Sequence, residues 1–117
     1  MNPTELRQRM KAYALRVLNL CRSLPPDEAA RILGRQLLGA GTSVGANYRS
    51  AGLGKSRSDF INKLKIAEEE CDESLYWMEL LVDSGIVHAA DLASLQREGA
   101  EILAILIASI RTARSRP

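Results

Sequence analysis

Residues 36–83 decide the fold, and they read QLLGAGTSVGANYRSAGLGKSRSDFINKLKIAEEECDESLYWMELLVD. The first half is rich in small residues and places Gln36, Ser43 and Asn47 along one helical stripe. The second half has the apolar spacing of a long amphipathic helix and carries a run of carboxylates. Together they predict two helices packed closely, with polar groups in the contact between them.

The same apolar spacing extends over the whole chain. Pro25-Pro26 breaks the chain after one helical segment, and Gly52-Leu-Gly54 makes a turn after the next. Short loops between long helices predict an all-α fold, an antiparallel up-down-up-down four-helix bundle that forms a single domain over residues 1–117. The helices are expected at about residues 4–23, 27–51, 57–83 and 89–111, with a basic tail over 111–117.

Three glycines, Gly39, Gly41 and Gly45, fall inside the second expected helix. Each costs about 1 kcal/mol relative to alanine in a helix interior. Their presence indicates either close approach by a neighbouring backbone or a break in the helix.

Composition narrows the class of protein. The chain contains no 18-residue apolar stretch and no hydrophobic signal segment, so we expect a cytoplasmic protein without a membrane partner. Cys21 and Cys71 occupy apolar helix positions, as expected for small buried residues in a reducing compartment.

Charge is unevenly distributed along the chain. Residues 1–58 hold ten Lys or Arg and three Asp or Glu, whereas residues 59–101 hold three basic and eleven acidic residues. Such polarity can join a basic face of one copy to an acidic face of the next, although it is also compatible with ordinary solvated helix faces.

Two segments carry more apolar residues than one bundle needs. Leu75–Val82 is apolar except at Glu79, and Ile102–Ile110 is apolar except at Ser109. A helix that is apolar all round must be covered on several sides, which predicts a homo-oligomeric contact, and the uneven charge favours a ring-shaped assembly. The candidate contact residues are Tyr76, Trp77, Leu80, Leu81, Ile105 and Ile107.

The patterns that would indicate chemistry are incomplete. Gly54-Lys55-Ser56 resembles the end of a phosphate-binding loop, but Arg49 stands where the first glycine belongs and a helix precedes it. The carboxylates of residues 68–73 lack the histidines of a bundle di-metal site, and the single histidine, His88, lies in a loop. We therefore expect no cofactor, no metal and no enzymatic activity.

A structural role is predicted for Glu73. Ser43 and Asn47 could hydrogen-bond its carboxylate in a polar clasp that fixes the register of two helices. A catalytic role for Glu73 is the less favoured alternative.

The basic residues are the remaining functional indication, because they could contact phosphates. Interleaved aromatic residues, typical of single-strand binding, are absent. The arginines near the C-terminus could instead complement a helix dipole. The candidate nucleic-acid-binding residues are Arg7, Arg9, Lys11, Arg16, Arg22, Arg31, Arg35, Arg49, Arg111, Arg114 and Arg116.

Ser43-Val-Gly-Ala-Asn47-Tyr-Arg, followed by Phe60, Leu64-Lys-Ile66-Ala67 and Glu73, resembles a known family. Its members are four-helix bundle proteins encoded in intervening sequences of bacterial large-subunit ribosomal RNA genes, and accessory proteins of diversity-generating retroelements are related to them. The family often has Glu-Gly where this chain has Ser50-Ala51, and Gly-Ser where it has Glu69-Glu70. The resemblance implies a ring, commonly a pentamer, and for the retroelement relatives contact with nucleic acid and a reverse transcriptase.

These observations favour a non-enzymatic, homo-oligomeric bundle that binds RNA or DNA through its first two helices and its C-terminal tail. The alternative is a scaffold that recruits a reverse transcriptase or another protein without touching nucleic acid.

Overall fold

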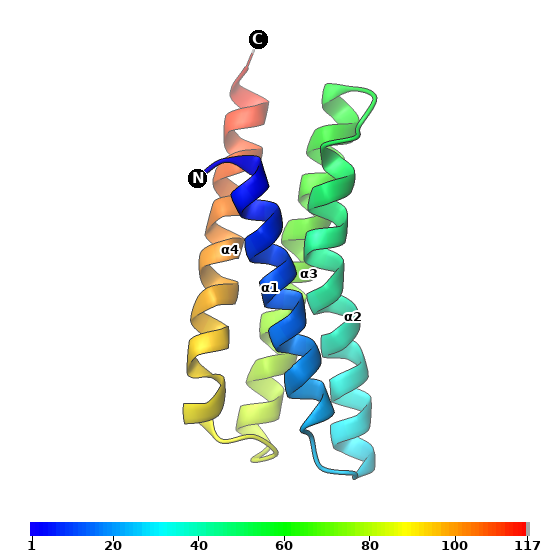
Figure 1. Cartoon of the computed structure of the whole chain (residues 1–117), viewed down its shortest axis with the longest axis vertical. Coiled ribbons are helices and arrows are strands. Elements are labelled where there is room, and N and C mark those ends of the chain that lie inside the picture. The colour runs from blue at the N-terminus through cyan, green and yellow to red at the C-terminus, as the bar shows by residue number, and fades with distance from the viewer. Residues whose placement is uncertain (117) are drawn as a thin grey trace.

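The computed structural model describes residues 1–116 of the 117-residue chain, and within them the protein consists of four helices. Consecutive helices run in opposite directions and form an elongated bundle of 50 × 22 × 20 Å (Figure 1). The predicted all-α, four-helix architecture is confirmed. The helices are α1 (Pro3–Arg22), α2 (Glu28–Ala51), α3 (Arg57–Asp83) and α4 (Ala89–Ser115).

The end of α4 differs from the prediction. The helix continues to Ser115, so that Arg111 and Arg114 are helical residues and not part of a tail. Ile102–Ile110 is followed by Ala113, which is also buried, so the apolar spacing that holds α4 to the bundle extends one turn further. The last residue of the predicted tail, Pro117, lies outside the described residues.

Side chains adjacent to the helices determine where three of them begin. The Asn2 side chain accepts a hydrogen bond of 2.9 Å from the Glu5 amide, and Asp27 accepts one of 2.8 Å from the Ala30 amide. Ser56 caps α3 in the same way. Each such cap stabilises a helix by about 1 kcal/mol. Gly85 has φ of +80° directly after the C-cap of α3, the left-handed conformation that favours glycine at the C′ position.

Apolar side chains from all four helices fill the core, which also contains a polar link. The hydroxyl of buried Tyr13 on α1 lies 2.8 Å from Oγ of Ser74 on α3, and Ser74 donates to the Cys71 carbonyl at 2.6 Å. Gly99 on α4 makes room for this group, because a Cβ there would lie 2.8 Å from the Tyr13 hydroxyl. The largest fully buried residues include Met10, Leu37, Leu64, Met78, Ile102 and Leu106.

The glycines of α2 serve close packing, and the helix is unbroken from Glu28 to Ala51. A Cβ on Gly41 would lie 2.9 Å from both methyl groups of Val17, and one on Gly45 would lie 3.3 Å from Met10 Cβ. Val17 and Met10 belong to α1, so the glycines bring α2 against α1. Gly39 has open space around it and has no such role.

The predicted polar clasp is wrong for the described chain. Ser43 donates to the Gly39 carbonyl and Asn47 to the Ser43 carbonyl, both within α2. Glu73 is exposed and accepts a hydrogen bond from the Trp77 indole one turn away. The reason is register: Asn47 is one turn from the end of α2, while Glu73 is more than four turns into α3, an axial offset of about 18 Å.

Candidate nucleic-acid interface

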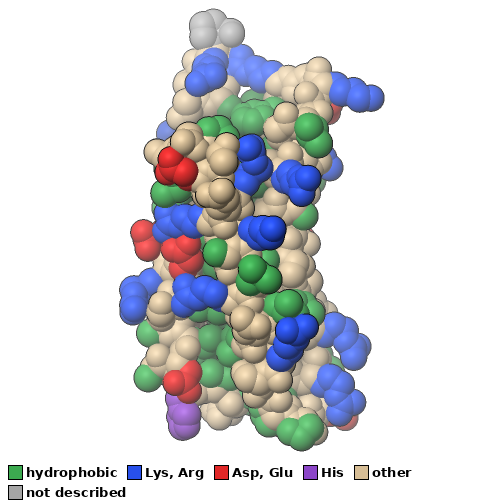
Figure 2. Space-filling model, viewed as in Figure 1, with side chains coloured by type: hydrophobic (Ala, Val, Ile, Leu, Met, Phe, Trp, Pro, Cys, Tyr) green, Lys and Arg blue, Asp and Glu red, His purple; other side chains and the backbone are tan. Residues whose placement is uncertain are grey.

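The face formed by α1 and α2 is free of carboxylates along most of its length. Residues 6–26 and 29–58 contain no Asp or Glu. The two helices pack along one another, and Figure 2 shows Lys and Arg side chains gathered over both of them. Asp27 and Glu28 stand between Arg22 and Arg31 in the sequence, at one end of this face. Over the rest of the face no acidic residue alternates with the cations, so their fields add and favour an anionic partner.

Three of the predicted residues lie around one groove. Arg7 and Lys11 from α1 and Arg49 from α2 line a concavity of about 480 Å³ between the two helices, and we call them the upper cluster. Gly45 contributes to the floor of this groove, because it allows the α2 backbone to approach Met10. The groove therefore depends on a small residue at position 45.

A second group of cations lies at the opposite end of the same face. Arg31 and Arg35 line a pocket of about 380 Å³ beside Pro25 and Pro26. Arg22 is the last residue of α1, and the chain crosses to α2 directly below it. We call Arg22, Arg31 and Arg35 the lower cluster. All three side chains are exposed and therefore accessible to a ligand.

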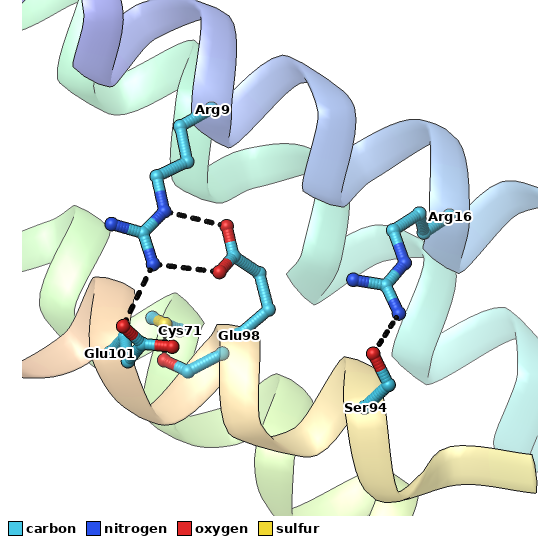
Figure 3. A network of polar contacts seen from close by, with 7 residues as sticks. Arg9, Arg16, Cys71, Ser94, Glu98 and Glu101 are labelled. Atoms are coloured by element: carbon cyan, nitrogen blue, oxygen red, sulfur yellow. Dashed lines mark hydrogen bonds and ion pairs between the residues drawn. The ribbon is translucent and has the colours of Figure 1, made fainter.

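Arg9 and Arg16, two further candidates, are turned toward α4 (Figure 3). Arg9 donates two hydrogen bonds of 2.7 Å to Glu98 and lies 3.3 Å from Glu101. Arg16 donates to the Ser94 hydroxyl at 2.9 Å. The guanidinium of Arg9 holds the pKa of the Glu98 carboxyl below its ordinary value. These contacts make Arg9 a structural residue that joins α1 to α4, and not a free phosphate ligand.

The arginines of α4 do not join the α1/α2 face. Arg111 and Arg114 line a pocket with Ile107 and with residues of α3, on the opposite side of the bundle. Arg116 lies at a groove that also contains Phe60. The structure therefore separates the predicted basic residues into an α1/α2 face, an α1–α4 contact and the C-terminal end of α4.

The α1/α2 face presents little aromatic surface. Tyr13 is fully buried and Tyr48 is partly buried. Burial raises the pKa of the Tyr48 phenol, while the nearby positive charge of Arg7 lowers it. Neither ring is displayed as a platform on which a base could stack.

The predicted oligomer-contact residues do not form one patch. Leu81 is fully buried in the core, so the prediction that it lies at an oligomer contact is wrong. Tyr76 on α3 is 51% exposed, and Ile107 on α4 is 39% exposed. Ile107 lines a pocket with Lys65, and Lys65 lies about 16 Å from Tyr76 along α3. Tyr76 and Ile107 are therefore far apart. Ile105 lines a different groove. Trp77 and Leu80 are partly buried.

Sequence reasoning missed the residues whose importance depends on the register between helices. Gly45 and Thr42 line the upper groove, yet only the small-residue character of α2 pointed to them. Arg57 was also missed: it donates to the Ala113 carbonyl near the end of α4, and so ties α3 to α4.

Two general features of the described residues bear on function. Within residues 1–116, no three His, Cys, Asp or Glu side chains are placed to share a metal ion. No helix in that range is long and apolar enough to cross a membrane.

The fold and the face together define a small all-α bundle with a cationic two-helix surface. Residues 3–108 match the family model described as 23S rRNA-intervening sequence protein, and the chain belongs to that family. It is similar to the crystal structure of a protein of unknown function from the S23 ribosomal protein family of Bacteroides thetaiotaomicron VPI-5482. The two share 35% identity with a TM-score of 0.88, over 95% of this chain and 99% of the other. A search of curated proteins finds no match.

Proposed function

We propose that this protein is a non-enzymatic nucleic-acid-binding bundle that contacts phosphates through its α1/α2 face. The observation that carries the proposal is the arrangement of the upper and lower clusters on one face that has no carboxylate between Leu6 and Pro26 or between Ala29 and Ser58. Six exposed cations so placed would release counterions from a bound polyanion.

Salt dependence tests this proposal. For six phosphate contacts per chain, log K should fall with log salt with a slope of about −4 to −5. Replacing the upper cluster by glutamates (Arg7→Glu, Lys11→Glu, Arg49→Glu) should abolish binding of a 20-nucleotide RNA at 150 mM salt. The control is Arg111→Glu with Arg114→Glu, which makes two of the same kind of charge reversal on the opposite side of the bundle.

Assembly into a homo-oligomer is part of the same proposal. Tyr76 is an exposed aromatic residue on α3, and its ring packs edge-on against Trp77 with centroids 5.2 Å apart. This aromatic pair would lie in the contact between copies and leave the α1/α2 face free, and the family resemblance implies a ring of five. Sedimentation at micromolar concentration should show a single closed oligomer; a monomer would exclude it.

A protein-binding scaffold is the second candidate. It is favoured by an apolar groove of about 650 Å³ at the end of the bundle where α4 extends beyond α1. Leu6, Phe60 and Ile105 line it, and 37% of the Phe60 surface is exposed. A partner such as a reverse transcriptase could insert an apolar side chain there.

The two functions respond differently to matched variants. Phe60→Ala should abolish capture of a protein partner and leave RNA binding unchanged, whereas the upper-cluster glutamates should do the reverse. If no RNA binds at any salt concentration while Phe60→Ala removes a co-purifying reverse transcriptase, the scaffold function is correct.

A further inference from the structure

The upper and lower clusters are separated along the bundle axis. Lys11 precedes Arg22 by eleven residues on α1, and Arg35 precedes Arg49 by fourteen on α2. At 1.5 Å per residue, the two clusters lie about 16 to 21 Å apart. In Figure 2 the Lys and Arg side chains over α1 and α2 fall into groups, with uncharged surface between them.

The surface between the clusters is uncharged, and Leu15 projects from it with 52% of its surface exposed. It is formed by small or apolar residues of both helices, and Gly39 in particular adds no side chain. Thr42 supplies the hydroxyl group of this strip; it donates to the Leu38 carbonyl at 2.7 Å, which leaves its oxygen lone pairs available as acceptors. The strip residues are Ala14, Leu15, Gly39, Thr42 and Ala46, of which Ala14, Thr42 and Ala46 also line the upper groove.

From this arrangement we infer that the α1/α2 face binds double-stranded RNA across its minor groove, with one cluster on the phosphates of each strand. The inference rests on the proposed nucleic-acid-binding function and specifies its ligand. The A-form minor groove is wide and shallow, and it exposes 2′-hydroxyl groups and lies between two rows of phosphates. An uncharged strip flanked by two cationic clusters is complementary to that arrangement.

Other nucleic acids match the face less well. The B-DNA minor groove is narrow and deep, about 6 Å wide and 7.5 Å deep, and the major groove is read by side chains that protrude. The strip has no long polar side chain to enter it. Single strands are usually held by exposed aromatic rings, and Tyr13 is buried while Tyr48 is partly buried.

Thr42 provides the discriminating contact. Its acceptor oxygen can receive a hydrogen bond from a 2′-hydroxyl group, which DNA lacks. The Thr42→Val variant removes this oxygen while retaining a β-branched side chain. It should lower the affinity for duplex RNA about three- to tenfold without changing the affinity for duplex DNA.

The test compares the full chain with three ligands of one sequence, a 20-base-pair RNA duplex, the equivalent DNA duplex and the single-stranded RNA, at fixed salt. Duplex RNA should bind at least tenfold more tightly than either of the others. Neutralising the lower cluster (Arg22→Gln, Arg31→Gln, Arg35→Gln) or the upper cluster (Arg7→Gln, Lys11→Gln, Arg49→Gln) should each weaken duplex binding at least tenfold. Circular dichroism and the melting temperature verify that each variant is folded.

The possible failures are distinct. Single-stranded RNA binding as tightly as the duplex, or DNA duplex binding as tightly as RNA, would overturn the minor-groove inference and leave the proposed function standing. Loss of affinity from only one of the two clusters would also overturn it. Absence of binding to all three ligands would remove the proposed function as well.

Discussion

Arg9 on α1 and Glu98 on α4 form a bidentate ion pair, in which Nε and Nη2 of Arg9 each lie 2.7 Å from a carboxylate oxygen of Glu98. Both side chains are about one-fifth exposed. Because α1 and α4 share the least extensive contact between neighbouring helices, this pair has a large influence on how α1 is held. Glu98→Gln should therefore lower the free energy of unfolding by about 1 kcal/mol at pH 7.

The same pair predicts a pH dependence. The folded-state pKa of Glu98 is lowered by Arg9, so its contribution to stability is present above the unfolded carboxyl pKa of about 4.3 and is lost as pH falls further. The stability difference between wild type and Glu98→Gln should thus shrink between pH 5 and pH 3. Urea unfolding at both pH values measures it, and a difference that is independent of pH would contradict the assignment.

Tyr13 and Ser74 should respond unequally to loss of their hydroxyl groups. Tyr13→Phe leaves Ser74 with the Cys71 carbonyl as its partner, and should cost about 1 kcal/mol. Ser74→Ala leaves the buried Tyr13 hydroxyl without the partner it has in the structure, and should cost more, about 2 kcal/mol. Thermal unfolding of the two variants compares them; equal melting temperatures would argue against the polar link.

Burial also raises the pKa of Tyr13 to about 12. Titration of tyrosine absorbance should therefore show a phenol component that ionises near pH 12. Tyr13→Phe should remove that component and leave the rest unchanged.

Gly39 and Gly41 of α2 should respond in opposite ways to substitution by alanine. Gly39→Ala enters open space and should stabilise the protein by up to about 1 kcal/mol, through helix propensity. Gly41→Ala would clash with the stiff, branched Val17 side chain and should destabilise it by about 1 to 3 kcal/mol. Chemical denaturation of both variants tests this. Stabilisation by both substitutions would mean that α1 and α2 do not pack as closely as described.

The parts of the fold that are encoded locally could be predicted from the sequence. Asn2, Asp27, Ser56 and Gly85 act within one turn of their own positions, so the helix ends they determine are visible in the sequence. The prediction of the polar clasp was wrong because the clasp is not encoded locally. Glu73 and Asn47 belong to different helices, and their separation depends on an axial register that helical periodicity does not specify.

In the candidate site, too, local features could be predicted and features that depend on the register between helices could not. The basic character of the first two helices is evident from composition, but the convergence of Arg7, Lys11 and Arg49 depends on how Gly45 seats α2 against α1. Similarly, Arg7 and Arg9 are two residues apart and so project from different sides of α1. Arg7 lines the upper groove, whereas Arg9 is directed to Glu98. Periodicity identified Leu81 as apolar but could not distinguish a core position from a surface one.

The most direct test of the central claim measures RNA affinity against salt concentration for wild type, the upper-cluster glutamate variant and the Arg111→Glu/Arg114→Glu control. The α1/α2 interface predicts a steep salt dependence in wild type and in the control. The slope should be smaller by about 2 to 3 in the upper-cluster variant, for three lost phosphate contacts. An affinity that does not change with salt, or that falls equally in the control, would contradict it.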